Sequence, residues 1–97
     1  ISSNENVAYI SGDFNFILSR ERLFLNLLSH LSGISTLTRE IVDIVNSKNP
    51  NTTILATRKT TPGLRFLEKE AVIHGGGAPH RYDLSEAILV KDNHLTL

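Results

Sequence analysis

A short apolar run leads into a cationic turn and then into a helical pattern, and this succession constrains the possible fold most. Residues 52–56 are β-branched or apolar and predict a buried strand. Thr61 and Pro62 then match a helix N-cap followed by Pro at the first helical position, with a helix to about Val72. Residues 87–90 predict a second buried strand. Strand, helix, loop and strand over ~40 residues form a βαβ unit, so the expected fold class is α/β.

One such unit cannot cover its own sheet. Parallel strands need packing on both faces, and open edges invite further pairing. We therefore expect additional strands that this sequence does not contain. The chain starts at Ile1 rather than Met. Its last residues, Leu95-Thr96-Leu97, are expected to lie within a secondary-structure element rather than at its end. The sequence is thus expected to be a piece of a longer protein.

The first half of the chain predicts a strand region and then a long amphipathic helix. Residues 6–16 are predicted to form the strand region, and Ser19 is the predicted N-cap of the helix. Apolar residues at spacings of three and four give the helix one broad stripe. We expect a kink or a close backbone approach at Gly33, and an end before Pro50. The stripe consists of Phe24, Leu27, Leu28, Leu31, Ile34, Leu37, Ile41, Ile44 and Val45.

Composition excludes several classes of protein. The 97 residues suffice for about one small domain. Ten Lys and Arg balance ten Asp and Glu, so no basic field favours nucleic acid or anionic lipid. No run approaches the roughly 20 apolar residues of a membrane span. The absence of Cys excludes disulfides and thiolate metal sites, which suits a cytoplasmic protein. The glycine triplet lacks the residues of a nucleotide-binding motif, and the four histidines lack metal-site spacing.

Cations follow both predicted strands. Thr57, Arg58 and Lys59 come after the first strand, and Lys91 comes after the second. Ligands of parallel α/β folds bind at the carboxyl ends of the strands, so these residues share one rim. Converging cations repel one another unless an anion fills the space between them. The alternative is that Arg58 and Lys59 are solvated loop residues that pair with nearby carboxylates.

Four further residues could belong to a site. His80 and Arg81 lie in the loop before the second predicted strand. Arg22 falls in the first turn of the predicted long helix, where a cation is electrostatically disfavoured. It is either a surface residue paired with an acid or a residue held there for a ligand. Asp92, at a strand end, is a candidate to hold a divalent cation or to orient a lysine.

These residues, in this order and spacing, resemble the quinolinate phosphoribosyltransferase family, also called carboxylating nicotinate-nucleotide pyrophosphorylases. The resemblance extends from about Ser19 to His94. The matching segments are Glu21-Arg22, Leu25-Asn26-Leu27-Leu28, Leu31-Ser32-Gly33-Ile34, Thr36-Leu37-Thr38, Thr57-Arg58-Lys59-Thr60-Thr61-Pro62-Gly63-Leu64-Arg65, Glu68-Lys69, Gly75-Gly76-Gly77, His80-Arg81, Leu84-Ser85 and Lys91-Asp92-Asn93-His94.

The resemblance implies a fold with two parts, an N-terminal α/β sandwich domain and an incomplete, seven-stranded α/β barrel. Residues 1–18 would end the sandwich domain, residues 19–50 would form connecting helices, and residues 51–97 would supply the first two βα units of the barrel. It also implies a cytoplasmic transferase of NAD biosynthesis. That enzyme joins quinolinate to phosphoribosyl pyrophosphate and releases pyrophosphate and carbon dioxide, with Mg²⁺ accompanying the pyrophosphate.

The resemblance further implies roles for individual residues. Lys59 and Lys91 would face both substrates and take part in catalysis. Arg22 would reach across a homodimer, or a higher homo-oligomer, into the neighbouring site. The implied substrate-binding set is Arg22, Thr57, Arg58, Lys59, His80, Arg81 and Lys91. The family's further acidic residues have no counterpart in this chain, so its metal ligands are unknown apart from the candidate Asp92, and the chain alone is expected to be inactive.

Two alternatives remain open at the level of sequence. Ala56 replaces an acid that many relatives carry, and Ala78-Pro79 replaces an Asn-containing stretch before His80. The segment Pro79-His80-Arg81 resembles the corresponding segment of a sister group, the pyrophosphorylase-like proteins associated with molybdenum transport. The other alternative is a non-catalytic fragment or interaction module whose long apolar helix is a binding surface.

Overall fold

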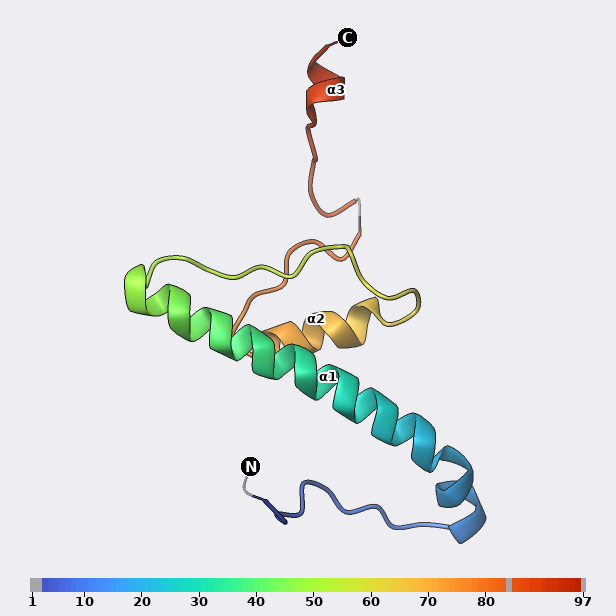
Figure 1. Cartoon of the computed structure of the whole chain (residues 1–97). Coiled ribbons are helices and arrows are strands. Elements are labelled where there is room, and N and C mark those ends of the chain that lie inside the picture. Colours follow the sequence, from blue (N-terminus) through green and yellow to red (C-terminus); the bar gives the residue numbers. More distant parts are fainter. Residues whose placement is uncertain (1–2, 84, 97) are drawn as a thin grey trace.

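The structure is a computed structural model that describes residues 3–83 and 85–96. Within these ranges it contains the helices α1 (Phe14–Lys48), α2 (Arg65–His74) and α3 (Asp92–Leu95). Figure 1 shows α2 packed across the middle of the long α1, with α3 standing apart at the end of an extended tail. The molecule is elongated, with extents of 60 × 34 × 16 Å. Leu84 and Leu97, which belong to patterns noted above, lie outside the described residues.

Helix α1 begins six residues earlier than predicted, with Asp13 rather than Ser19 as its N-cap. The carboxylate of Asp13 accepts a hydrogen bond from the backbone N–H of Phe16 at 2.9 Å, which caps the helix before Phe14. Ser19 is therefore inside the helix, where its hydroxyl donates to the carbonyl of Phe16 at 2.9 Å. The predicted strand at residues 6–16 is wrong, because residues 5–13 form no strand and the rest of that range is helical. Arg22 consequently lies beyond the first turn, so the helix-terminus argument for it does not apply.

Helix α1 then continues without a break to Lys48. A Cβ added to Gly33 would meet nothing within 4 Å, so the predicted close approach at this glycine is wrong. The backbone N–H of Asn49 donates to the carbonyl of Val45 at 2.8 Å and ends the helix. This end, immediately before Pro50, confirms the prediction that proline limits the helix.

The close approach occurs instead where α2 ends against α1. A Cβ on Gly75 would stand 2.5 Å from the carbonyl oxygen of Ser35 and 2.6 Å from the Cβ of Thr38. One turn earlier, the Ser35 hydroxyl donates to the carbonyl of Ala71 at 2.8 Å. The glycine is therefore required by close packing of the two helices.

The core among the described residues is small. Val42, Ala56 and Ala71 are its buried apolar side chains. Helix α2 covers only part of the apolar stripe of α1, and Leu37 and Ile44 remain 57% and 66% exposed. This exposure agrees with the expectation that one βαβ unit cannot cover its own apolar surface. No helix of the described residues is both long and apolar enough to cross a membrane.

The predicted strands are reduced to one parallel bridge between Leu55 and Ala78. The backbone N–H of Ala78 donates to the carbonyl of Ile54 at 2.8 Å, and that of Ala56 donates to the carbonyl of Ala78 at 3.0 Å. The predicted buried strand at residues 87–90 is wrong, since it is exposed and unpaired. A parallel strand requires a neighbour on which to form its ladder, and the described residues present none beside this segment.

Helix α2 also begins later than predicted. Gly63 has a φ of 80°, a left-handed conformation that cannot belong to a right-handed helix. Thr61 to Leu64 therefore form a turn, in which the N–H of Leu64 donates to the carbonyl of Thr61 at 3.0 Å, and the helix starts at Arg65. The glycine triplet ends α2 after His74, as its composition predicts.

Candidate active site

Six of the seven predicted site residues line a single hollow of about 540 Å³. It lies between the segment around the bridge at Leu55, the loop after α2 and the extended segment before α3. Among the described residues, its lining contains five cationic or titratable basic side chains and no acid. The predicted residues in the lining are Thr57, Arg58, Lys59, His80, Arg81 and Lys91.

The first wall of the hollow is a turn held by hydroxyl groups. The side chain of Thr57 accepts a hydrogen bond from the N–H of Lys59 at 3.1 Å. The hydroxyl of Thr60 accepts one from Nε of Arg65 at 3.2 Å. These bonds fix the backbone on both sides of Arg58 and Lys59 without using the charged ends of either. The turn therefore presents two adjacent cations.

A carboxylate buried beneath the turn ties it to both helices. Oε2 of Glu68 accepts from the N–H of Thr61 at 3.0 Å, and Oε1 accepts from Nε2 of His30 at 2.9 Å. The hydrogen bond from Thr61, together with His30, holds the pKa of Glu68 below its ordinary value in spite of burial. Glu68 thus anchors the turn before α2 to the middle of α1.

The second wall is the loop that carries His80 and Arg81, which Tyr82 attaches to α2. The ring of Tyr82 lies 6.3 Å from that of Phe66, and its carbonyl accepts from Nη1 of Arg65 at 3.2 Å. Arg65 thus contacts both walls, through Thr60 on one side and Tyr82 on the other. Helix α2 is the element that sets the spacing of the two walls.

Arg81 and Arg58 differ in how their guanidinium groups are held. Nη1 of Arg81 donates to the carbonyl of Ala87 at 2.7 Å, which closes the loop after it. Arg58 is half-buried, and its Nε has no hydrogen-bond partner among the described residues. A hydrogen bond from Ser85, with Arg58 nearby, lowers the pKa of Asp83. Both guanidinium groups retain donors that can bind an anion.

The third wall ends at the start of α3. Lys91 stands at the N-cap position, its N–H 3.4 Å from Nδ1 of His94, and its side chain lines the hollow. Its neighbour Asp92 is exposed and is not in that lining. The described residues contain no group of three or more His, Cys, Asp or Glu side chains that could hold a metal ion.

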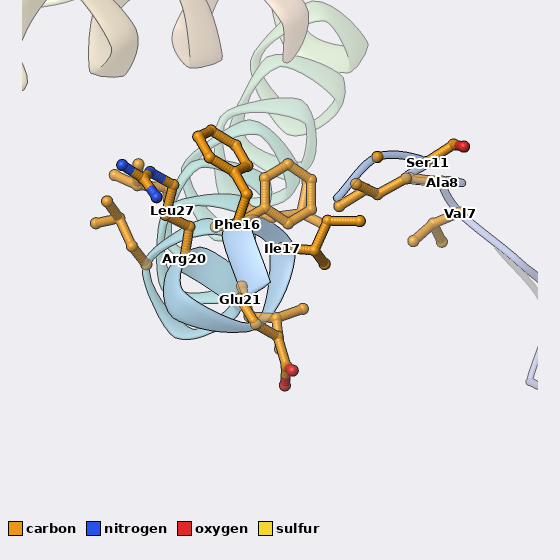
Figure 2. A pocket seen from close by; sticks show the side chains of 14 residues that line it. Val7, Ala8, Ser11, Phe16, Ile17, Arg20, Glu21 and Leu27 are labelled. Carbon is orange, nitrogen blue, oxygen red and sulfur yellow. The ribbon is translucent and has the colours of Figure 1, made fainter. Parts of the chain in front are cut away.

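Arg22 does not join the other predicted residues. It is exposed on the N-terminal part of α1 and does not line the hollow. Near it is a roomier hollow of about 720 Å³, between residues 7–12 and the start of α1. Figure 2 shows side chains such as Val7, Ile17 and Leu27 lining it, with Arg20 and Glu21 as its charged members. Its lining is largely apolar and lacks the converging cations of the first hollow.

Sequence reasoning missed three residues that support the site, namely Glu68, Lys69 and Tyr82. Helical spacing contained a signal for the first two. Glu68 precedes Ala71 by three residues, and Lys69 precedes Val72 and Ile73 by three and four, so charges stand on the packed face of α2. The signal for Tyr82 was absent, because its contacts depend on how the loop returns to α2.

Such a site can bind a compact ligand with more than one negative group. Arginine offers a planar fork that suits carboxylate or phosphate, and lysine offers a point charge. No side chain among the described lining residues is placed as a nucleophile beside a general base and an acid. The converging cations can position such a ligand and stabilise negative charge on it.

Comparison with known proteins identifies the family. A model of the quinolinate phosphoribosyl transferase C-terminal domain matches residues 34–97, which is more than half of the chain. The chain belongs to this family. It is 45% identical over 97 residues to the probable nicotinate-nucleotide pyrophosphorylase (carboxylating) of Methanothermobacter thermautotrophicus, covering 100% of this chain and 35% of that protein. It is 47% identical over 95 residues to the protein of the same description from Bacillus subtilis, covering 98% and 32% respectively.

Solved structures of the family agree. NadC from Streptococcus pyogenes matches with a TM-score of 0.76 and 45% identity over 88% of this chain and 30% of that one. A NadC deletion mutant matches with a TM-score of 0.78 and 46% identity over 87% of this chain and 29% of that one. This likeness confirms the α/β fold class. The chain spans about a third of the length of the curated relatives that it matches.

Proposed function

We propose that the complete protein transfers the phosphoribosyl group of phosphoribosyl pyrophosphate to quinolinate and releases pyrophosphate and carbon dioxide. The product is nicotinate mononucleotide, a precursor of NAD. Membership of the family supports this assignment. The single structural observation that carries it is the convergence of Arg58, His80 and Arg81 with two lysines on one hollow.

In this proposal, the two carboxylates of quinolinate are bound by Arg58, His80 and Arg81. Bidentate arginine contacts suit a planar dicarboxylate and orient its ring nitrogen. That nitrogen forms a bond to the ribosyl carbon while the bond from this carbon to pyrophosphate breaks. One carboxylate then leaves as carbon dioxide, and the ring carbon that keeps the electron pair takes up a proton from solvent. Lys59 and Lys91 stabilise the negative charge that grows on the departing pyrophosphate. Thr57 holds the turn from which two of these cations project.

The proposal also assigns the segments of this chain to the domains and subunits of the complete protein. Residues 1–18 form the end of an α/β sandwich domain, and residues 51–97 form the first part of a seven-stranded α/β barrel. Residues 19–50 connect these two domains. Arg22 projects from α1 into the site of a second subunit in a homodimer or higher oligomer, which agrees with its exposure and its place outside the hollow. We also propose a cytoplasmic location. Mg²⁺ is part of the proposal as a companion of pyrophosphate, with ligands expected from phosphoribosyl pyrophosphate and from residues outside this chain.

Steady-state kinetics of Arg81→Ala in the full-length protein test the assignment. We expect the KM for quinolinate to rise by at least about tenfold, because removing one partner of a charge-assisted pair costs roughly 1.5–3 kcal/mol. Arg81→Lys keeps the charge without the fork and should fall between wild type and alanine. Arg39→Ala, an exposed arginine of α1 that pairs with Asp43, is the matched control and should leave the KM unchanged. Unchanged kinetics in Arg81→Ala would refute the role of this residue.

A further inference from the structure

Lys69 is a buried lysine whose ammonium group has no hydrogen-bond partner in the described part of the chain. Its side chain is 0% exposed, and Nζ makes no hydrogen bond among the described residues. Nζ lies 5.1 Å from the centre of the Tyr82 ring, which offers only partial compensation for a cation. Burial, reinforced by the nearby Arg65, lowers the pKa of Lys69 below its ordinary value. The charged form of this lysine is therefore costly in the described structure.

Two acids that could compensate the charge of Lys69 are already engaged. Glu68, the preceding residue, accepts hydrogen bonds from Thr61 and His30 with its two oxygens. Glu86 is near enough to favour the charged form of Lys69, but its carboxylate accepts the backbone N–H of Tyr82. A methionine of similar volume would fill the same space without the penalty of a buried charge. Packing alone therefore does not explain a lysine at this position.

The position of Lys69 connects it to the candidate active site. It lines a hollow of about 240 Å³ between α1, α2 and residues 54–57. Thr57 and Lys59 line this hollow and also the larger one that holds the converging cations. Arg58 lies between Thr57 and Lys59, and its buried Nε has no hydrogen-bond partner within residues 3–83 and 85–96. The charge of Arg58 also disfavours the charged form of Lys69 and lowers the pKa of that lysine. Two buried nitrogens of cationic side chains, Nζ of Lys69 and Nε of the half-buried Arg58, thus lie in the same small region without a hydrogen-bond partner among the described residues.

We propose that Lys69 is a positioning residue for anion binding, whose unpaired charge behind the Thr57–Lys59 turn makes the hollow bind a ligand with two or more negative charges. The lysine does not touch this ligand. It raises the positive potential at Arg58 and Lys59 and stays uncompensated until the anion arrives. The inference rests on the proposed function for its ligand, quinolinate, and it assigns Lys69 a role in affinity at the expense of stability.

The test compares wild type, Lys69→Met and Lys48→Met in the full-length protein. Lys48 is an exposed lysine in the last turn of α1 and controls for the loss of one positive charge. We expect Lys69→Met to raise the melting temperature of the unliganded protein, because it removes an unpaired buried charge. We also expect its calorimetric Kd for quinolinate to weaken by at least about tenfold, because a lysine charge at roughly 10 Å and an effective dielectric constant of about 20 has about this effect on each negative charge of the ligand. Lys48→Met should change neither quantity appreciably.

A higher melting temperature together with weaker quinolinate binding in Lys69→Met distinguishes this role from a merely structural one. A lower melting temperature in Lys69→Met would overturn the inference, since it would show that the lysine has a stabilising partner in the full protein. A higher melting temperature with unchanged quinolinate affinity would also overturn it. If wild type binds inorganic pyrophosphate but not quinolinate, the proposed function fails. The inference about Lys69 then stands only if Lys69→Met weakens pyrophosphate binding. If wild type binds neither anion, both the proposed function and the inference about Lys69 are overturned.

Discussion

At the scale of single residues, the site depends on side chains that never enter the hollow. Glu68 is the clearest example, because one carboxylate joins the turn before α2 to His30 of α1. The pKa of Glu68 is lower in the folded protein than in the unfolded chain, where it is about 4.3. Its contribution to stability is therefore complete above the unfolded pKa and is lost as pH falls through the folded pKa.

We expect Glu68→Gln to destabilise the full-length protein by about 1–2 kcal/mol at neutral pH, since a charge-assisted pair is replaced by neutral hydrogen bonds. The difference from wild type should shrink as pH falls from the unfolded pKa of about 4.3 through the lower folded pKa, because wild type then also loses the charge. Urea unfolding across pH measures this difference, with Glu40→Gln on the exposed face of α1 as the control. A difference that stays constant down to the lowest pH would contradict the role of the Glu68 charge.

The sequence was more informative about cations that face a ligand than about those that support them. The rule that ligands bind at strand ends predicted that Arg58, Lys59 and Lys91 lie together, and the hollow contains all three, although the strand predicted before Lys91 does not form. Lys69 could not be placed, because its burial depends on where Tyr82 returns to α2. Periodicity indicates which face of a helix is packed, but the neighbour on that face is a tertiary property.

At the scale of elements, the predicted boundaries agree with the structure where the sequence signal acts locally. The end of α1 before Pro50 and the end of α2 at the glycine triplet were predicted correctly, because proline and glycine act through their own backbone. The start of α1 was missed, since Asp13 competes with Ser19 as the cap. The strand predicted at residues 87–90 failed because a strand depends on a partner, which a local pattern does not reveal.

Alanine substitutions at two glycines are predicted to change stability in opposite directions, and they test the packing of α2 on α1. Gly75→Ala should destabilise the full-length protein by about 1–3 kcal/mol, because its Cβ would clash with the carbonyl of Ser35. Gly33→Ala should stabilise it by about 0.5–1 kcal/mol, because an open helix interior prefers alanine. Chemical denaturation of both variants measures the two effects. Equal effects of the two substitutions would contradict the packing described for this interface.

At the scale of the whole molecule, the chain carries a well-formed group of cations on an incompletely covered scaffold. The long apolar stripe of α1 remains partly exposed, and the pairing of residues 52–56 is limited to one bridge. Both features fit a chain that spans about a third of its curated relatives. The arrangement around α2 nevertheless brings together six of the seven residues that the family resemblance implies for substrate binding.

The measurement that tests this account most directly is isothermal titration of the full-length protein with quinolinate, using nicotinate as the matched acid with one carboxylate fewer. If Arg58, His80 and Arg81 together bind two carboxylates, quinolinate should bind at least about tenfold more tightly than nicotinate, since one lost charge-assisted contact costs roughly 1.5–3 kcal/mol. Equal affinity for the two acids, or binding of neither, would contradict the assignment of this hollow to a dicarboxylate.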